Sequence, residues 1–269
     1  MGSKILLVND DGFMTKALPL TYRALEGLGE VLVIVPEIPK SGGGHSLTLH
    51  KPIFVRELTV HDFVTYVING TPVDAIHVAR GIFGFEPDVV VSGVNIGENT
   101  SAQNILYSGT VEAAIEAGLF GYPALAFSAD VSTDTEFEEP VFSYLVRRVV
   151  ESSVSYVIRH GWFKSVDAIS INIPKPGRPC GVVMARTQKV RFIQSYERRV
   201  DPRGREYFWL VGHRVVDSGT DSYYLSKGYI VVTPLRSDLT HPGLSGCPEL
   251  PKGVNDFIEH LRTVLKSLG

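Results

Sequence analysis

The chain has 269 residues, with 26 Lys and Arg, 29 Asp and Glu, and a formal net charge of −3. This length suits one large α/β domain, or a core with a smaller appended unit, and the slightly acidic balance argues against nucleic acid as a stable partner. No apolar run approaches the ~18 residues of a membrane span. Since no charged leader precedes the first apolar run either, we expect a cytoplasmic protein without a membrane partner.

The N-terminal part alternates apolar runs with helical patterns, which predicts a βαβ unit with a right-handed crossover, followed by a loop and a hairpin. In chain order the expected elements are a strand over 5–8, a helix capped by Thr15 and ended by Gly29, a strand over 31–35, a glycine-rich loop over 41–46, and a hairpin of 53–55 with 64–68.

The alternation continues, and Thr71 followed by Pro72 is typical of a helix start. The expected elements are a helix from 71, a strand over 89–91, a helix over 110–117, a strand over 124–127, a long helix over about 142–160 and a strand over 168–173. We therefore predict an α/β fold of three αβα layers, Rossmann-like, with a doubly wound and mostly parallel sheet. The acidic stretch 130–139 is expected to be a solvated loop.

The alternation of predicted strands and helices ends after Pro174. We predict a Rossmann-like catalytic core over 1–180 and an extension over 181–269 that is not an independent domain. The extension should hold a projecting hairpin over about 189–216, a strand over 229–233 that returns to the core, and a terminal helix near 254–268. Such an arm most often pairs with another subunit.

Cysteine and histidine spacing offers no site for a soft metal ion. Cys180 and Cys247 form neither a CxxC pair nor a zinc signature, so we expect unlinked thiols; a disulfide remains an alternative in an unusually hot or oxidising setting. The eight histidines have no HxxxH or HxH spacing. We interpret them as surface or packing residues, and keep only His45, in the glycine-rich loop, open for a role near a substrate.

Polar clusters follow three of the predicted strands: Asp10 with Asp11, 41–46, and 92–95. In an open parallel sheet, loops at the carboxyl ends of the strands form the binding crevice. Two adjacent carboxylates at the end of a buried strand are costly unless a positive charge meets them. Carboxylate, amide and hydroxyl oxygens suit Mg²⁺, Mn²⁺ or Ca²⁺ better than zinc or copper, so a divalent cation is predicted here.

A further cluster, 107–111, precedes a predicted helix, and hydroxyls and free amides at a helix N-terminus favour an anion such as phosphate. The alternative is that Ser108 or Thr110 only caps the helix. Other nucleotide-binding folds fit poorly, because the first turn lacks GxGxxG, the glycine loop lacks the P-loop lysine, and the strand over 89–91 leads into no acceptor aspartate.

Seven segments carry a likeness to a known family. In chain order they are 9–12, Ser41 with 46–48, 69–74, 92–99, 107–111, 170–174 and 219–221. Together they resemble the family of the stationary-phase survival protein SurE, divalent-metal-dependent phosphatases that act as 5′- and 3′-nucleotidases. The likeness covers nearly the whole chain. The sequence departs from the family at 13–17, where Ala-Pro-Gly is frequent, and at Thr100, where glycine is common, which leaves fine specificity open.

The resemblance implies a set of site residues and partners. The implied metal ligands are Asp10, Asp11, Ser41 and Asn95; the residues implied near the phosphate are Asn99, Ser108, Gly109 and Thr110. It also implies one Mg²⁺ or Mn²⁺ per subunit, with Ca²⁺ as an alternative, a nucleotide substrate, and a dimer or tetramer.

We therefore expect hydrolysis of nucleoside 5′- and 3′-monophosphates through a metal-activated water. Asp10 and Asp11 should chiefly hold the ion, and one of them could also steer or deprotonate the attacking water. The alternative is a metal- and nucleotide-binding sensor without turnover. Base preference, 5′ against 3′ preference, action on polyphosphate, the physiological metal and dimer against tetramer stay undetermined.

Overall fold

The computed structural model describes residues 2–240 and 258. Contacts divide the chain into two units, Met1–Leu235 and Arg236–Gly269. The second unit is described only at 236–240 and 258, so the helix predicted near 254–268 lies outside the described residues apart from Ile258. None of the described helices is both long and apolar enough to cross a membrane.

The first unit is built on one twisted sheet. Within the described residues this sheet has nine strands in the order β3-β4-β2-β1-β5-β6-β7-β11-β8. Their bounds are β1 Ser3–Val8, β2 Gly29–Pro36, β3 Val55–Val60, β4 Phe63–Ile68, β5 Val89–Ile96, β6 Ala124–Ala129, β7 Ala168–Ile173, β8 Gly181–Met184 and β11 Tyr229–Leu235. Only the pairs β3–β4 and β7–β11 are antiparallel.

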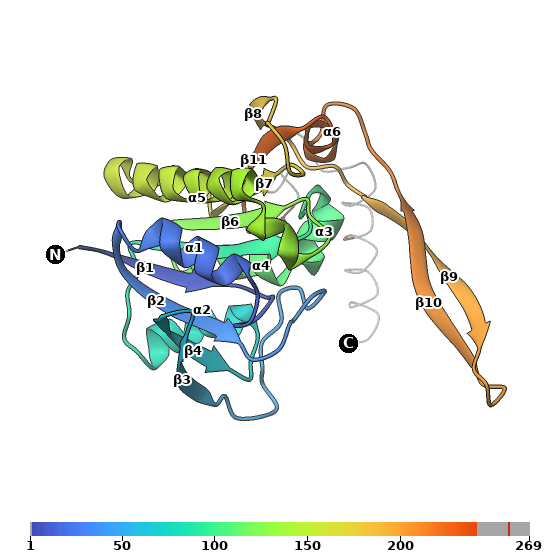
Figure 1. Cartoon of the computed structure of the whole chain (residues 1–269), viewed down its shortest axis with the longest axis horizontal. Helices are drawn as coiled ribbons and strands as arrows, with labels where there is room; N and C mark the ends of the chain where they lie inside the picture. Colours follow the sequence, from blue (N-terminus) through green and yellow to red (C-terminus); the bar gives the residue numbers. More distant parts are fainter. Residues whose placement is uncertain (1, 241–257, 259–269) are drawn as a thin grey trace. The chain divides into compact units, whose positions relative to one another are not determined.

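Helices cover both faces of this sheet. Their bounds are α1 Ala17–Leu25, α2 Pro72–Gly81, α3 Ser101–Tyr107, α4 Gly109–Leu119, the short 3₁₀ helix η1 Asp134–Glu138, α5 Pro140–His160 and α6 Asp221–Ser226. Helices α1 and α5 lie on one face, and α2 and α4 on the other (Figure 1). The predicted three-layer, doubly wound fold is confirmed.

Alternate residues of the central strands supply the two cores. In β1, Leu7 packs in the cluster that includes Phe142 of α5, whereas Leu6 packs in the cluster that includes Ile76 of α2. All of these side chains are essentially inaccessible to solvent. Because both faces of β1 are buried, its sequence is a continuous apolar run rather than an alternating one.

Three details of the N-terminal part were predicted wrongly. Helix α1 ends at Leu25, and Gly29 opens β2. A Cβ at Gly29 would lie 2.0 Å from the carbonyl oxygen of Ser3, so this glycine serves the approach of β2 to β1. Thr15 is not the N-cap, which is Lys16, although its Oγ1 accepts from the Ala17 amide at 3.4 Å. The strand predicted over 53–55 instead runs over Val55–Val60.

The acidic stretch 130–139 is more ordered than the predicted loop. Helix η1 begins with a capping box between Thr133 and Glu136. Phe137 is 3% exposed and stacks on Phe142. Glu139 accepts from the Phe142 amide at 2.6 Å and so caps α5. Two of these acids, Glu136 and Glu139, therefore bind backbone amides at helix starts instead of only facing solvent.

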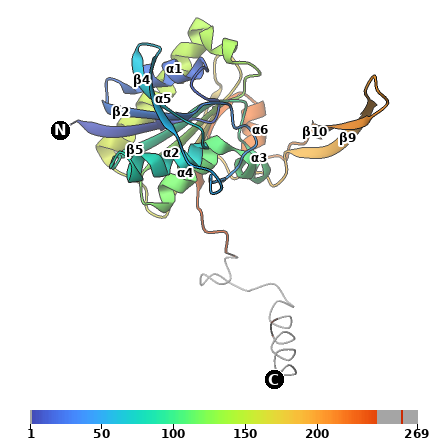
Figure 2. The same cartoon turned by 90° about the horizontal axis from the view of Figure 1, so that it is seen from below.

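Strands β9 Phe192–Val200 and β10 Glu206–Arg214 form the predicted hairpin, called the arm below. The arm is a separate two-stranded antiparallel sheet, and it projects away from the nine-stranded sheet (Figures 1 and 2). Its chain then returns through α6 to β11, which pairs antiparallel with β7. Cys180 is an exposed free thiol, whereas Cys247 lies outside the described residues.

Asp74 ties two segments together. It completes the capping box of α2 with Thr71, as the Thr-Pro start predicts. Its carboxylate also accepts from the amide and the hydroxyl of Thr48, at 3.0 and 2.6 Å. Burial opposes the charged form, but the hydrogen bonds from Thr48 and Thr71 outweigh it, so the pKa of Asp74 is lowered.

We predict that Asp74→Asn lowers the free energy of unfolding at neutral pH by about 1–3 kcal/mol, because amides and hydroxyls lose a charged acceptor. Because the pKa of Asp74 is lower in the folded state, its carboxylate stabilises the fold at pH values above the pKa of the unfolded state. This contribution is lost as the pH falls through the folded-state pKa. Urea unfolding from neutral to acidic pH measures both effects. Asp217→Asn, at an exposed aspartate, is the control; equal effects of the two variants would contradict the prediction.

Candidate active site

The turn after β1 is closed by its own residues. Asn9 is buried, and its Nδ2 donates to the Gly12 carbonyl at 2.9 Å while its Oδ1 accepts from the Gly12 amide at 3.1 Å. Gly12 has φ of 84°, a conformation that suits glycine. This closed turn carries Asp10 and Asp11 off the end of the buried strand.

The two carboxylates are held from different elements. Asp10 is 3% exposed, and its Oδ1 accepts from the hydroxyl of Thr110 in α4. Asp11 accepts from the Ile96 amide of β5 at 3.1 Å. A Cβ on Gly109 would lie 3.0 Å from the Cβ of Asp10, so glycine allows α4 to begin against this carboxylate.

Electrostatics at this turn favour a bound cation. Burial raises the pKa of Asp10, despite the Thr110 hydrogen bond, and burial together with the charge of Asp10 raises the pKa of Asp11 to about 7. Among the described residues, no cationic side chain forms an ion pair with either aspartate. The charge of both carboxylates is thus left for a ligand to compensate.

Asn95 is aimed by an irregularity of β5. The register between β5 and β6 shifts between Ser92 and Asn95, and such a bulge redirects a side chain. The Nδ2 of Asn95 donates to the carbonyls of Ile96 and Gly97, at 3.2 and 2.8 Å. Both amide hydrogens are therefore engaged, and Oδ1 is oriented as an acceptor.

One pocket of about 200 Å³ gathers most of the predicted site residues. Its lining residues that had been predicted are Asp10, Ser41, Asn95, Asn99 and Ser108. The other three predicted residues do not line it. The hydroxyl of Thr110 donates to the Asp10 carboxylate, and Gly109 packs against the side chain of Asp10. The carboxylate of Asp11 accepts from the backbone amide of Ile96 in β5.

Ser108 is the N-cap of α4 and also stands at the pocket. Its side chain accepts from the Val111 amide at 3.1 Å and so caps α4, and the residue also lines the pocket. The side chain of Thr110 does not cap α4, because Ser108 is the N-cap and the Thr110 hydroxyl donates to Asp10. Helix α3, which sequence reasoning missed, places Asn104 and Tyr107 at the same pocket.

Asn99 is fixed by two residues that were assigned no role. Its backbone amide donates to Asn172 Oδ1 at 2.8 Å, and its Nδ2 donates to Ser128 Oγ at 2.9 Å. Ser128 lies near the end of β6, and Asn172 near the end of β7. Asn172 stands in the segment 170–174 noted above, and that segment was the one sequence signal for this contact.

The donor set fits a hard divalent cation. Two carboxylates, a hydroxyl and an amide oxygen are oxygen donors of the kind that Mg²⁺, Mn²⁺ and Ca²⁺ prefer. The described residues contain no cluster of three or more His, Cys, Asp or Glu that could hold a metal ion. The candidate ligands are therefore of mixed type, with only two acidic residues.

His45 does not line this pocket, so its suggested place near a substrate is not seen. Its Nδ1 lies 2.7 Å from Glu112 and its Nε2 lies 2.6 Å from Glu116, both on α4. Hydrogen bonds that the ring donates to Glu112 and Glu116 outweigh burial and raise the pKa of His45 to about 9. The ring therefore fastens the glycine-rich loop to α4 as a cation.

We predict that His45 contributes stability that depends on pH. Because its folded pKa is raised, the contribution is complete below the unfolded value of about 6.5 and is lost as the pH rises through about 9. A third of the side chain is exposed, so screening limits the difference from His45→Gln to about 1–2 kcal/mol.

Urea unfolding of wild type and His45→Gln across this pH range measures the difference in the free energy of unfolding. His50→Gln, at an exposed histidine of the same segment, is the control. A difference between wild type and His45→Gln that stays constant through the range would contradict the prediction.

Comparisons with known proteins place this site in context. A family model described as "Survival protein SurE" matches residues 5–194. A protein of Thermofilum pendens named 5′-nucleotidase SurE is 44% identical over 234 residues, covering 86% of this chain and 90% of its own. One of Hyperthermus butylicus with the same name is 43% identical and covers 87% and 84%. The crystal structure of SurE protein from Aquifex aeolicus is 33% identical with a TM-score of 0.75, and covers 90% and 97%.

Proposed function

The chain belongs to the SurE family, and from this we propose that it is a divalent-metal-dependent phosphomonoesterase that hydrolyses nucleoside 5′- and 3′-monophosphates to nucleoside and phosphate. The observation that carries the proposal is the pocket at the carboxyl edge of the sheet, where Asp10, Ser41 and Asn95 meet Asn99 and Ser108. Relatives named 5′-nucleotidase SurE at 43–44% identity support the reaction class.

Each element of the pocket has a part in this reaction. A divalent cation held by Asp10, Asp11, Ser41 and Asn95 would lower the pKa of a bound water and neutralise phosphoryl charge. Asn99, Ser108 and the amides at Gly109 and Thr110, at the start of α4, would orient the phosphate, since a helix N-terminus favours an anion. Hydrogen bonds to β6 and β7 hold Asn99 ready for that task.

The nucleoside part of the substrate has a candidate contact in Tyr107. This side chain is 50% exposed and the residue lines the pocket next to Asn104. Every nucleobase has a face on which an aromatic ring can stack. A half-exposed ring at the pocket therefore supports a nucleotide over a small phosphomonoester without a base.

We predict that wild-type protein releases inorganic phosphate from nucleoside monophosphates with Mg²⁺ or Mn²⁺ and that a chelator abolishes release. Asp11→Asn should lower kcat about 100-fold or more, because positioned charge at the phosphoryl group is lost. Asp88→Asn, at the opposite edge of the sheet, is the control. Nucleotide binding without phosphate release under every condition would overturn the proposal in favour of a sensor.

The donor chemistry also predicts a ranking of the metal ligands. A neutral serine hydroxyl is a weaker ligand than a carboxylate, so Ser41→Ala should weaken Mn²⁺ binding less than Asp10→Asn does. We expect a loss of about tenfold for the serine variant and of more than that for the aspartate variant. Calorimetric titration of Mn²⁺ into both proteins measures the ranking, and equal losses would contradict it.

We also propose that residues after 180 serve assembly into a dimer or tetramer through the arm. Large apolar side chains on both of its strands are exposed, among them Tyr196, Phe208 and Trp209. An exposed apolar ribbon favours pairing with a second copy. Light scattering should give a mass of at least twice 29.5 kDa, and Trp209→Glu should lower it; a wild-type mass equal to one chain would contradict the proposal.

A further inference from the structure

Arg191 occupies the base of the arm, where both of its strands join the body. It directly precedes β9, and its carbonyl accepts from the amide of Val215, which directly follows β10, at 2.9 Å. Its side chain is only 6% exposed. Through Nη1 the guanidinium also donates to the Val215 carbonyl at 2.9 Å. Arg191 therefore joins the two ends of the arm through both its backbone carbonyl and its side chain.

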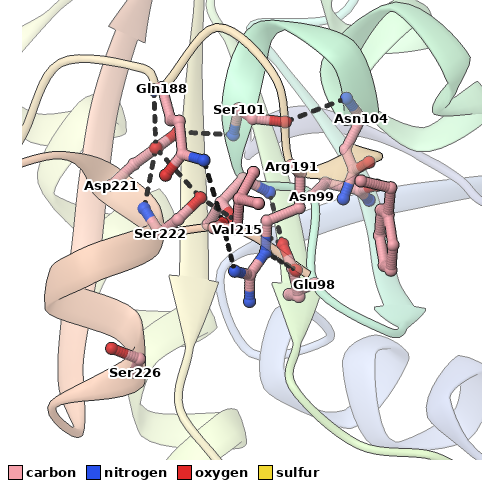
Figure 3. A network of polar contacts seen from close by, with 12 residues as sticks. Glu98, Asn99, Ser101, Asn104, Gln188, Arg191, Val215, Asp221, Ser222 and Ser226 are labelled. Atoms are coloured by element: carbon pink, nitrogen blue, oxygen red, sulfur yellow. Dashed lines mark hydrogen bonds and ion pairs between the residues drawn. The ribbon is translucent and has the colours of Figure 1, made fainter. Parts of the chain in front are cut away.

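The same guanidinium reaches the wall of the active-site pocket. Its Nε lies 2.8 Å from Oε1 of Glu98, whose side chain is 3% exposed and which lines that pocket. Figure 3 shows Arg191 between Glu98 and Val215. The second carboxylate oxygen of Glu98 accepts from the amide of Thr100 at 2.8 Å and from its hydroxyl. Glu98 thus relays the position of Arg191 to the residues that flank Asn99.

A second set of contacts keeps this base rigid. Asp221 accepts from the amides of Ser101 and Gln188, at 2.7 and 2.9 Å, and the Gln188 side chain donates to Val215 at 2.9 Å (Figure 3). Ser101 has φ of 74°, which is strained for a residue with a Cβ. Glu98 and Ser101, on either side of Asn99, are therefore held by residues that follow 185 in the chain, whereas Asn99 itself is held by Asn172 and Ser128.

The metal-ligand side of the pocket does not depend on these contacts. Asn95 is oriented by the carbonyls of Ile96 and Gly97, and the Gly97 amide donates to Ala129 of β6 at 2.9 Å. Asp10 and Asp11 are held by α4 and β5. A change at the arm base would therefore disturb Asn99 and leave the candidate metal ligands in place.

We propose that Arg191 is a positioning residue through which the base of the arm sets the Glu98–Asn99 segment for phosphate binding. The assignment of phosphate to Asn99 rests on the proposed function. The position of the arm and the affinity for phosphate then both depend on the buried ion pair between Arg191 and Glu98. Removing one partner of such a pair leaves an uncompensated buried charge, whereas removing both does not.

The test uses full-length protein loaded with Mn²⁺ and inorganic phosphate as the probe. Arg191→Met should weaken phosphate binding about tenfold while Mn²⁺ affinity changes less than about twofold, since coupling through a contact network is of this size. The phosphate affinity of Arg191→Lys should lie between those of wild type and Arg191→Met, because an ammonium keeps the charge but cannot bind Glu98 and Val215 with a planar fork. Arg199→Met, at an exposed ion pair of the arm, is the control.

A double variant separates positioning from stability. Arg191→Met with Glu98→Gln removes both charges of this ion pair, so its unfolding midpoint should recover toward wild type while phosphate affinity stays weak. Wild-type phosphate affinity in folded Arg191→Lys or in the double variant would overturn the proposal, and so would a parallel loss of Mn²⁺ and phosphate binding. Phosphate binding is measured without turnover, so a wild-type protein that hydrolyses no nucleotide would refute the proposed function alone.

Discussion

Two neighbouring carboxylates stand at the end of a strand that is buried on both faces, and their charge governs the arrangement of everything around them. Burial alone raises the pKa of Asp10, and for Asp11 the charge of its neighbour adds to that effect. Within the described residues the protein offers hydrogen bonds to them but no ion pair. We propose that a cation completes this site, to which the other oxygen donors at the same edge of the sheet would also bind.

That convergence depends on close approaches that only glycine permits. Gly109 brings the start of α4 against Asp10, and a Cβ at Gly44 would lie 2.7 Å from the Leu106 carbonyl, so the loop that carries Ser41 can pack on α3. The loop is then fastened by His45, whose cationic ring binds two glutamates of α4. Helix α4 thus contacts both Asp10 and the loop that carries Ser41.

Residues after 185 do more than project from the core. Through Arg191 and Asp221 they hold Glu98 and Ser101 in the segment that carries Asn99. The arm, for which we propose pairing with a second copy, and the pocket, for which we propose phosphate binding, therefore share one buried ion pair. This arrangement gives a physical route by which assembly and substrate binding could be linked.

Much of the fold follows from local pattern alone: continuous apolar runs predict β1, β5, β6 and β7, Thr71 with Pro72 predicts α2, and the turn at 201–204 predicts the arm. The choice of Asp10, Ser41, Asn95 and Ser108 as neighbours also follows, because parallel strands present their carboxyl ends at one edge, whereas Asn99 was expected only from the family resemblance. Local pattern failed where the partner is distant: Gly29 faces Ser3, Phe137 packs on Phe142 beneath an acidic surface, and α3 is too short to show a period.

Only the tertiary structure decided that Thr110 donates to Asp10, that His45 binds two glutamates of α4, and that Arg191 reaches Glu98. Those contacts join residues 67 to 100 positions apart, and burial and geometry at that range leave no periodic trace in the sequence.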